Sequence, residues 1–240
     1  MSSIKAEMKP SLERQPFESA RRVHVAPVVE FDAPPRRGSD FIIRAADIFI
    51  SLVAMIFLLP ALVCVAIGVT LQDSGPIFYG QNRIGRDGRM FKCFKFRSML
   101  VDADARLKQV LETDASARAE WERDHKLKND PRITPFGQFI RKTSLDEFPQ
   151  LWNVLRGEMS LVGPRPIVQA EVVKYGRSFP KYLSVKPGIT GLWQVAGRND
   201  VTYFRRVAMD RLFARKKNFV VYFVILFMTV PAVLLQRGSY

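Results

Sequence analysis

The feature that most restricts how this chain can fold is an uncharged, apolar segment at residues 48–71. As a straight helix it would be roughly 36 Å long, against a bilayer hydrocarbon core of about 30 Å. The core helix of a soluble domain is seldom this long and this apolar, so the sequence indicates a membrane protein. Pro60 divides the segment into halves of about 17 Å each, and a proline inside a helix removes one hydrogen bond and forces a kink.

Basic residues flank this segment on both sides. Arg36, Arg37 and Arg44 precede it, and the stretch 83–97 that follows is rich in arginine and lysine. A single crossing cannot place both flanks on the cytoplasmic side, where positive charge is favoured. We therefore predict a re-entrant membrane helix over residues 41–72, which enters and leaves by the cytoplasmic face. A kinked helix that spans the bilayer is the alternative.

The two ends of the chain differ in character. Residues 1–40 combine several prolines and mixed charges without sustained periodicity, so we predict a disordered N-terminal tail.

A second apolar run, at residues 219–235, is preceded by Lys217 and interrupted by Pro231. Because this run is at the short end for a span, residues 219–240 are predicted to form a membrane-associated interfacial helix. A second transmembrane helix is the alternative.

The composition narrows the class of partner. A formal net charge of +14 favours anionic partners such as nucleic acid, anionic lipid or a phosphorylated substrate. No recognised nucleic-acid-binding motif occurs, so we expect no nucleic-acid partner. The two cysteines, Cys64 and Cys93, imply no disulfide framework and favour a reducing compartment. The two histidines, His24 and His125, are far apart, which gives no support to a zinc site.

Residues 73–218, between the two apolar runs, are predicted to form a cytoplasmic catalytic domain. Residues 77–79 and 90–96 have the pattern of short strands, and the turn chemistry between them predicts a β-hairpin. Residues 100–128 are predicted to be helical. The chain lacks the glycine-rich motifs of dinucleotide-binding folds and P-loops. We expect an α+β fold: a small, mostly helical catalytic domain with a short β-hairpin, on a re-entrant membrane helix and amphipathic interfacial helices.

Two adjacent carboxylates, Asp146 and Glu147, lie at the predicted start of a short amphipathic helix that ends before Gly157. Its apolar stripe, at i, i+3, i+4 and i+7, consists of Phe148, Leu151, Trp152 and Leu155. Negative charge is favoured at a helix N-terminus, and carboxylates among basic residues suit phosphate or metal–phosphate chemistry. The alternative is a capping box, in which Ser144 and Glu147 only satisfy backbone amides.

Five sequence blocks, in a fixed order, carry a family resemblance. They are KFRSM at residues 95–99, DPRIT at 130–134, TSLDEFPQL at 143–151, GEMSLVGPRP at 157–166 and KPGITGLWQ at 186–194. From about residue 42 to the end, the chain resembles the bacterial sugar transferases, the monotopic polyprenyl-phosphate hexose-1-phosphate transferases. GRNDV at 197–201 and QRGSY at 236–240 further resemble the rhizobial exopolysaccharide galactosyl-phosphate transferases.

The resemblance implies a reaction, a cofactor and a location. Such enzymes move a hexose 1-phosphate, here galactose 1-phosphate by overall similarity, from a UDP-sugar to undecaprenyl phosphate and release UMP. This is the first membrane step of exopolysaccharide synthesis, at the cytoplasmic face of the bacterial inner membrane. Asp146 would be the nucleophile that forms an aspartyl phosphosugar, and Glu147 would hold Mg²⁺.

The resemblance also assigns phosphate-binding positions. Lys95, Arg141 and Arg165 match positions at which the family binds substrate phosphate. Arg97 and Arg132 are weaker candidates, because an arginine beside a carboxylate can be a structural ion pair.

One position departs from the family pattern. Family members commonly have serine before the helix-breaking proline, and here that position is Leu59. We therefore expect Ser51 or Thr70 to bond the carbonyl that Pro60 leaves free, or the segment to bend less sharply.

Two other classes of function remain open from the residues alone. One is a basic, membrane-anchored module that binds lipid or nucleic acid. The other is a Mg²⁺-dependent lipid phosphohydrolase that uses Asp146. UMP release from UDP-sugars separates the transferase from the binding module, and dependence on an acceptor lipid separates it from the hydrolase. The sequence does not specify the sugar or the oligomeric state.

Overall fold

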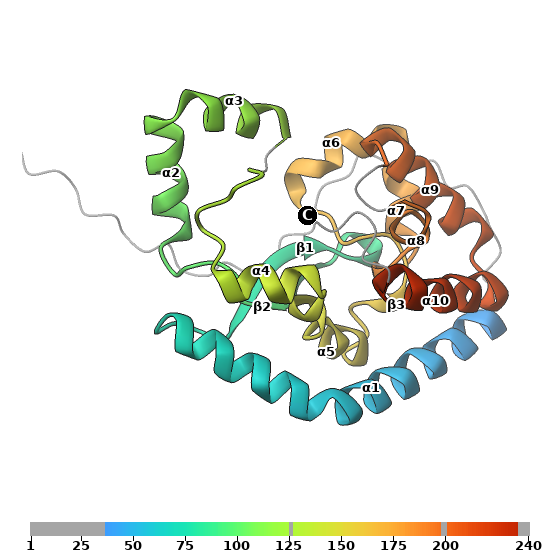
Figure 1. The fold of residues 1–240 in the computed structure, drawn as a ribbon. Coiled ribbons are helices and arrows are strands. Elements are labelled where there is room, and N and C mark those ends of the chain that lie inside the picture. The colour runs from blue at the N-terminus through green and yellow to red at the C-terminus, as the bar shows by residue number, and fades with distance from the viewer. Residues whose placement is uncertain (1–36, 125–126, 198–200, 235–240) are drawn as a thin grey trace, which may run out of the picture.

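A computed structural model of the chain describes residues 37–124, 127–197 and 201–234. The predicted tail therefore lies almost wholly outside the described residues, and so does His125. Figure 1 shows helices gathered around a small hairpin, with one long helix along the edge of the molecule. The described part of the chain confirms the coarse expectation of a mostly helical domain with a short hairpin.

The long helix α1 (Arg37–Gln72) contains the apolar segment and Pro60. It begins at Arg37, so the last residues of the predicted tail are helical. Figure 1 shows α1 bent partway along, with both arms rising toward the rest of the molecule. Among the described residues it is the one helix long and apolar enough to cross a membrane. Side chains around the middle of α1 are exposed, and Phe57 reaches 82% exposure.

The carbonyl that Pro60 leaves free does not receive the hydrogen bond that we expected. The Thr70 hydroxyl donates to the carbonyl of Ala66 at 2.9 Å, which belongs to its own turn. The Ser51 hydroxyl is buried without a hydrogen-bond partner. The prediction that Ser51 or Thr70 bonds the freed carbonyl was therefore wrong, because both hydroxyls lie too far along the helix from the break.

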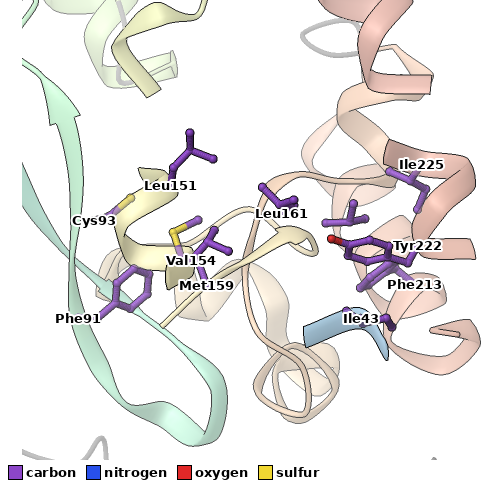
Figure 2. Packing of buried hydrophobic residues seen from close by; sticks show 11 residues of the cluster. Ile43, Phe91, Cys93, Leu151, Val154, Met159, Leu161, Phe213, Tyr222 and Ile225 are labelled. Atoms are coloured by element: carbon purple, nitrogen blue, oxygen red, sulfur yellow. The ribbon is translucent and has the colours of Figure 1, made fainter. Parts of the chain in front are cut away.

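Both arms of α1 pack on the rest of the described chain. In the first arm, Ile43 joins a buried core (Figure 2). The other elements that contribute to this core are β2 (Met90–Phe96), α5 (Gln150–Leu155), β3 (Ser160–Val162), α9 (Tyr203–Lys216) and α10 (Phe219–Leu234). In the second arm, Val65 and Val69 pack with Ile140 of α4 (Pro135–Lys142). A Cβ at Gly68 would come within 2.4 Å of the Phe136 ring, so α1 and α4 approach closely here.

The hairpin is antiparallel and consists of β1 (Phe78–Ile84) and β2 (Met90–Phe96), as predicted. Its register pairs Ile84 with Met90, at the turn, and Phe78 with Phe96 at the far end. The turn includes η1 (Arg86–Gly88), where Asp87 and Gly88 have φ values of 58° and 75°. Aspartate and glycine tolerate this left-handed region better than most residues, which explains why the turn forms here.

The helix predicted over residues 100–128 is instead two helices, α2 (Ala103–Thr113) and α3 (Ala115–Asp124). Asp114 is extended, with φ −120° and ψ 107°, and its carboxylate accepts hydrogen bonds from the backbone amides of Ser116 and Ala117. The aspartate thus caps the second helix and ends the first, which is the usual competition between a short acidic side chain and the helical backbone.

The segment with the paired carboxylates forms α4 (Pro135–Lys142), η2 (Leu145–Glu147) and α5 (Gln150–Leu155). Leu151 is buried as predicted, whereas Trp152 is 51% exposed. The predicted apolar stripe was therefore wrong at Trp152. Helix α5 buries Gln150, Leu151, Asn153 and Val154, so its inner face is centred on other residues than the predicted stripe.

The remaining elements include a parallel pair of short strands that we did not predict. It consists of β3 (Ser160–Val162) and β4 (Gly188–Thr190). Between them lie η3 (Gln169–Glu171), α6 (Val172–Tyr175), η4 (Gly176–Ser178) and α7 (Phe179–Leu183). After them come α8 (Leu192–Ala196), α9 (Tyr203–Lys216) and α10 (Phe219–Leu234). Helix α10 packs against α8 and β3, close to the first arm of α1.

Candidate active site

The backbone presents Asp146 and Glu147 from a tight turn between α4 and α5. Ser144, just before η2, has a φ of 60°, in the left-handed region that serine seldom occupies. Its side chain makes no capping hydrogen bond, so the capping-box interpretation does not hold for Glu147. Strained backbone of this kind is concentrated at functional sites. The two acids are therefore displayed by the turn and are not used to cap a helix.

Lys95 of β2 lies against both acids. Its Nζ atom is 2.6 Å from Glu147 Oε1 and 3.6 Å from Asp146 Oδ2. Arg165 Nη1 lies 3.9 Å from the same Glu147 oxygen. The structure thus brings together residues that are far apart in the sequence, two carboxylates and two of the predicted phosphate-binding cations.

Asp146 is a buried carboxylate, with 7% of its surface exposed. Burial raises the pKa of Asp146 and the neighbouring charge of Glu147 adds to the rise, while Lys95, Arg141 and Arg165 oppose it. A carboxylate that is poorly hydrated and close to cations has few water molecules to shed before it attacks an electrophile. This setting is typical of functional acids.

Arg141, in the last turn of α4, is also close enough to Asp146 to interact with its charge. Its Nε atom donates to Ser98 Oγ at 2.7 Å. The α4 N-terminus is fixed close by, because a Cβ at Gly137 would come within 2.0 Å of the Ser98 carbonyl oxygen. Burial lowers the pKa of Arg141, and the charge of Asp146 raises it. A guanidinium in this position is ready to pair with a phosphate oxygen.

Arg97 and Arg132 have structural partners. Arg97 Nη2 donates to the carbonyl oxygen of Asp73, next to the end of α1, at 2.8 Å. Arg132 binds the Asp130 carboxylate through two hydrogen bonds, of 2.8 and 2.7 Å, and lies over the ring of Trp121. Both arginines line the pocket described next, where Arg97 Nη1 is buried without a hydrogen-bond partner.

One pocket, of about 860 Å³, contains all the predicted site residues. They are Lys95, Arg97, Arg132, Arg141, Asp146, Glu147 and Arg165. This volume is in the range of pockets that enclose a drug-sized or nucleotide-sized molecule. Elements from β1 to α10 contribute to its walls, so the pocket extends from the hairpin to the second apolar helix.

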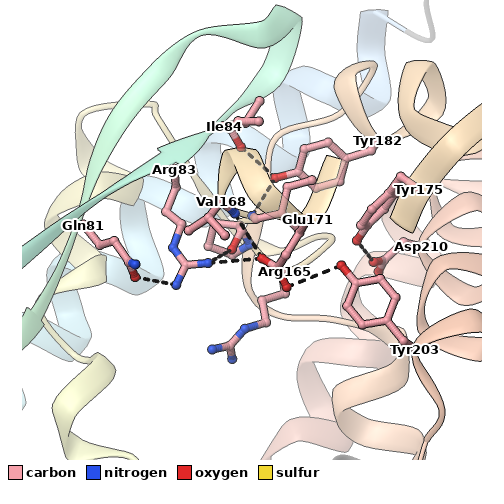
Figure 3. Close-up of polar contacts among 12 residues, drawn as sticks. Gln81, Arg83, Ile84, Arg165, Val168, Glu171, Tyr175, Tyr182, Tyr203 and Asp210 are labelled. Carbon is pink, nitrogen blue, oxygen red and sulfur yellow. Dashed lines mark hydrogen bonds and ion pairs between the residues drawn. The ribbon is translucent and has the colours of Figure 1, made fainter. Parts of the chain in front are cut away.

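Sequence reasoning missed the polar network that supports Arg165 (Figure 3). Arg83 of β1 donates to the carbonyl oxygen of Pro166 at 2.9 Å and lies 3.6 Å from Glu171. The Tyr182 hydroxyl donates to Ile84 O at 2.6 Å and accepts from the backbone amide of Ile167. These contacts fix the backbone that immediately follows Arg165. In the sequence, only the basic residue Arg83, on a strand next to the hairpin turn, could have indicated this network.

Comparison with known proteins agrees with the resemblance found in the sequence. The family model described as bacterial sugar transferase matches residues 38–236. The chain is 53% identical, over 205 residues, to the UDP-galactose-lipid carrier transferase of Erwinia amylovora. It is 51% identical, over the same length, to the undecaprenyl-phosphate galactose phosphotransferase of Salmonella typhimurium. Each match covers 85% of this chain and 43% of the relative, so the chain spans less than half the length of these two proteins.

A shorter relative is matched over most of its length. The exopolysaccharide production protein ExoY of Sinorhizobium fredii is 47% identical over 197 residues, which are 82% of this chain and 87% of that protein. The rhizobial resemblance is thereby confirmed. With the family model covering nearly all of the described residues, the chain belongs to the bacterial sugar transferase family.

Proposed function

We propose that the protein transfers a hexose 1-phosphate, galactose 1-phosphate in the first instance, from a UDP-sugar to undecaprenyl phosphate and releases UMP. The observation that carries the proposal is the buried carboxylate of Asp146 beside Lys95 and Arg141 in a large pocket. The names of relatives support the class of substrate, since they include a galactose phosphotransferase acting on undecaprenyl phosphate.

In the first displacement, a carboxylate oxygen of Asp146 attacks the phosphorus that carries the sugar. An Asp–O–P bond forms, the bond from that phosphorus to the bridging oxygen of the diphosphate breaks, and UMP leaves with the electron pair. Lys95, Arg141 and Arg165 bind the phosphoryl oxygens and stabilise the charge that accumulates on them. Asp146 must be ionised for this step, and these same cations favour its ionised form.

In the second displacement, a phosphate oxygen of undecaprenyl phosphate attacks the same phosphorus. The new P–O bond forms as the Asp–O–P bond breaks, which restores the Asp146 carboxylate and yields a lipid diphosphate sugar. Two displacements through a carboxyl phosphate are an established form of covalent catalysis. Because the acceptor belongs to a membrane, the pocket must open near the bilayer.

The residues present fit Mg²⁺ of the kind that is shared between protein and substrate. In the parts of the chain that the structure describes, no group of three or more acidic, histidine or cysteine side chains could hold a metal ion alone. Mg²⁺, however, is commonly bound through one or two carboxylates together with substrate phosphates. Glu147 would hold the ion with the donor diphosphate, and the bound ion supplies neutralising positive charge on that diphosphate. Arg132, which is bound to Asp130, serves mainly to shape the pocket, whereas Arg97 keeps a buried nitrogen, Nη1, without a hydrogen-bond partner there.

The packing of α1 supports a re-entrant insertion at the cytoplasmic face of the inner membrane. Asp47 in the first arm accepts a hydrogen bond from the backbone amide of Leu161 in β3, and Gly68 in the second arm packs against α4. A helix whose two arms both pack on one domain returns to the side from which it came. The exposed apolar side chains near the bend are the part suited to lipid. On this proposal residues 73–218 form the cytoplasmic catalytic domain and residues 219–240 associate with the membrane.

The test is UMP release from a panel of UDP-sugars, with and without undecaprenyl phosphate. The transferase should release UMP in multiple turnovers only when the acceptor lipid is present, and UDP-galactose should be the best donor. Without acceptor it should release at most one equivalent. Continued release without acceptor would indicate a hydrolase, and absence of release from every donor would contradict the proposal.

A further inference from the structure

We propose that the inner face of α10 forms the passage for the polyprenyl chain of the acceptor. The inference rests on the proposed function and names a subsite for one of its two substrates. It starts from the extent of the pocket. Leu226, Thr229 and Ala232 of α10 line the same pocket as Asp146 and Glu147.

The pocket is divided by charge. At the carboxylates it is lined by cations, among them Lys95, Arg141 and Arg165. Among its described lining residues, those from β4, α8 and α10 are all uncharged; they are Ile189, Thr190, Trp193, Gln194, Val195, Leu226, Thr229 and Ala232. A pocket with cations around its carboxylates and an uncharged wall formed by β4, α8 and α10 matches a molecule with an anionic head and an apolar tail.

The hydroxyl groups in this wall already have partners. The Thr190 and Thr229 hydroxyls lie 2.9 Å apart in a hydrogen bond, and Thr229 also donates to the carbonyl oxygen of Ile225. Gln194 Oε1 is the exception, because it is buried without a hydrogen-bond partner. Apart from it, the wall offers few polar groups to the sugar or nucleoside of a donor, whose hydroxyls would need hydrogen-bond partners. It suits an isoprenoid chain, which needs none.

Helix α10 also connects this wall to an apolar surface. Its buried side, including Tyr222 and Ile225, faces the core in Figure 2. Its outer side exposes Val224, Phe227 and Met228, among other apolar residues. Since one helix borders both the pocket and this apolar surface, a lipid tail can leave the reacting end along α10 without crossing polar solvent. The donor nucleoside is then expected to use other parts of the pocket lining, which include Tyr79 of β1 and Asp104 of α2.

The test compares Ala232→Trp with Val230→Trp in the full chain, reconstituted in lipid nanodiscs. Ala232 lines the pocket, whereas Val230, two residues earlier, is 58% exposed and lies on the opposite side of the same helix. Ala232→Trp should raise the KM for undecaprenyl phosphate at least tenfold. It should leave unchanged the amount of labelled sugar phosphate bound to the protein without acceptor. Val230→Trp should change neither. The defect should shrink for a prenyl phosphate of one or two isoprene units, because the obstruction lies in the path of the tail.

A second measurement applies if the tryptophan disturbs folding. In an Ala232→Cys, Cys64→Ala protein, undecaprenyl phosphate should slow alkylation of the thiol at position 232, and UDP-galactose should not. Protection by the UDP-sugar alone would overturn the inference, as would an unchanged KM for the lipid in Ala232→Trp. If instead the unmodified protein neither binds labelled sugar phosphate nor releases UMP, the proposed function itself fails.

Discussion

The Asp47 carboxylate accepts a hydrogen bond of 2.7 Å from the Tyr222 hydroxyl, which joins α1 to α10 across the described chain. The same Asp47 oxygen accepts from Ser160 Oγ at 3.0 Å and from the Leu161 amide at 2.8 Å. Asp47 is fully buried and directly precedes the apolar segment. One carboxylate thus fixes the first arm of the membrane helix to a strand and to the second apolar helix.

Tyr222→Phe should therefore lower stability without touching the pocket. Losing one buried hydrogen bond to a charged acceptor costs roughly 1.5–3 kcal/mol, which in a domain of this size corresponds to a fall in Tm of roughly 3–10 °C. Thermal unfolding of the detergent-solubilised protein measures this fall in Tm. Tyr79→Phe is the matched control, because Tyr79 is more than half exposed. Equal Tm values for the two variants would show that the Asp47 contact contributes little.

The nucleophile is tested by Asp146→Asn, which should abolish turnover and the trapping of labelled sugar phosphate on the protein. Asp146→Glu should also fail, since displacing the reacting oxygen by roughly 1 Å can cost about 100-fold in rate. Asp87→Asn, in the exposed turn of the hairpin and outside the pocket lining, should keep near-normal activity. Substantial turnover in either Asp146 variant would remove this residue from the mechanism.

The role of Glu147 is tested together with the metal. EDTA should silence the enzyme and Mg²⁺ should restore it. Zn²⁺ should substitute poorly, because among the described residues no group of three or more histidine, cysteine and acidic side chains could hold it. Glu147→Gln should lose most activity while keeping its Tm. Full activity in the presence of chelator would contradict the metal assignment.

Topology is tested with single cysteines at Ser39 and Ser74, in a protein whose two native cysteines are replaced. If α1 re-enters, neither thiol should react with an impermeant reagent in intact cells, and both should react after lysis. Pro60→Ala should straighten α1 and make position 39 reactive in part of the population. Labelling at position 39 in intact cells that retain Pro60 would establish a spanning helix instead.

Asp210 gives a prediction about pH. It is buried, it accepts a hydrogen bond from the Tyr175 hydroxyl at 2.7 Å, and burial raises its pKa to about 7. The folded state then binds more protons than the unfolded state between about pH 4 and 7, so this group's contribution to stability falls as pH rises through that window. Asp210→Asn should thus gain stability relative to the native protein on going from pH 4 to pH 8. A difference in Tm that stays constant with pH would refute the raised pKa.

Local features of the fold could be predicted from the sequence, and contacts between distant segments could not. The hairpin was found because Asp87 and Gly88 are residues that tolerate its turn. The pairing of β3 with β4 was missed because each strand is only three residues long and its partner is distant. Asp114 was hidden among many charged residues, although an aspartate within a helical stretch is a known signal for a break.

The candidate site shows the same division. The adjacency of Asp146 and Glu147 was visible in the sequence, and the family resemblance selected the cations around them. Their burial and the 2.6 Å contact of Lys95 with Glu147 depend on how β2 packs against η2. The support that Arg83 gives to the backbone after Arg165 joins positions too far apart for any local pattern to reveal.

If α1 is inserted as proposed, its attachment by both arms also determines how the domain is held at the bilayer. A domain on a single flexible stalk could swing and rotate above the bilayer, whereas one fastened at two points along a bent helix would be held at one height and in one orientation. Asp146 would then stay at a constant level relative to the lipid phosphates. Encounter with the proposed acceptor would become a search in two dimensions, so we expect the rate to follow the mole fraction of acceptor in the membrane and not its concentration in the bulk volume.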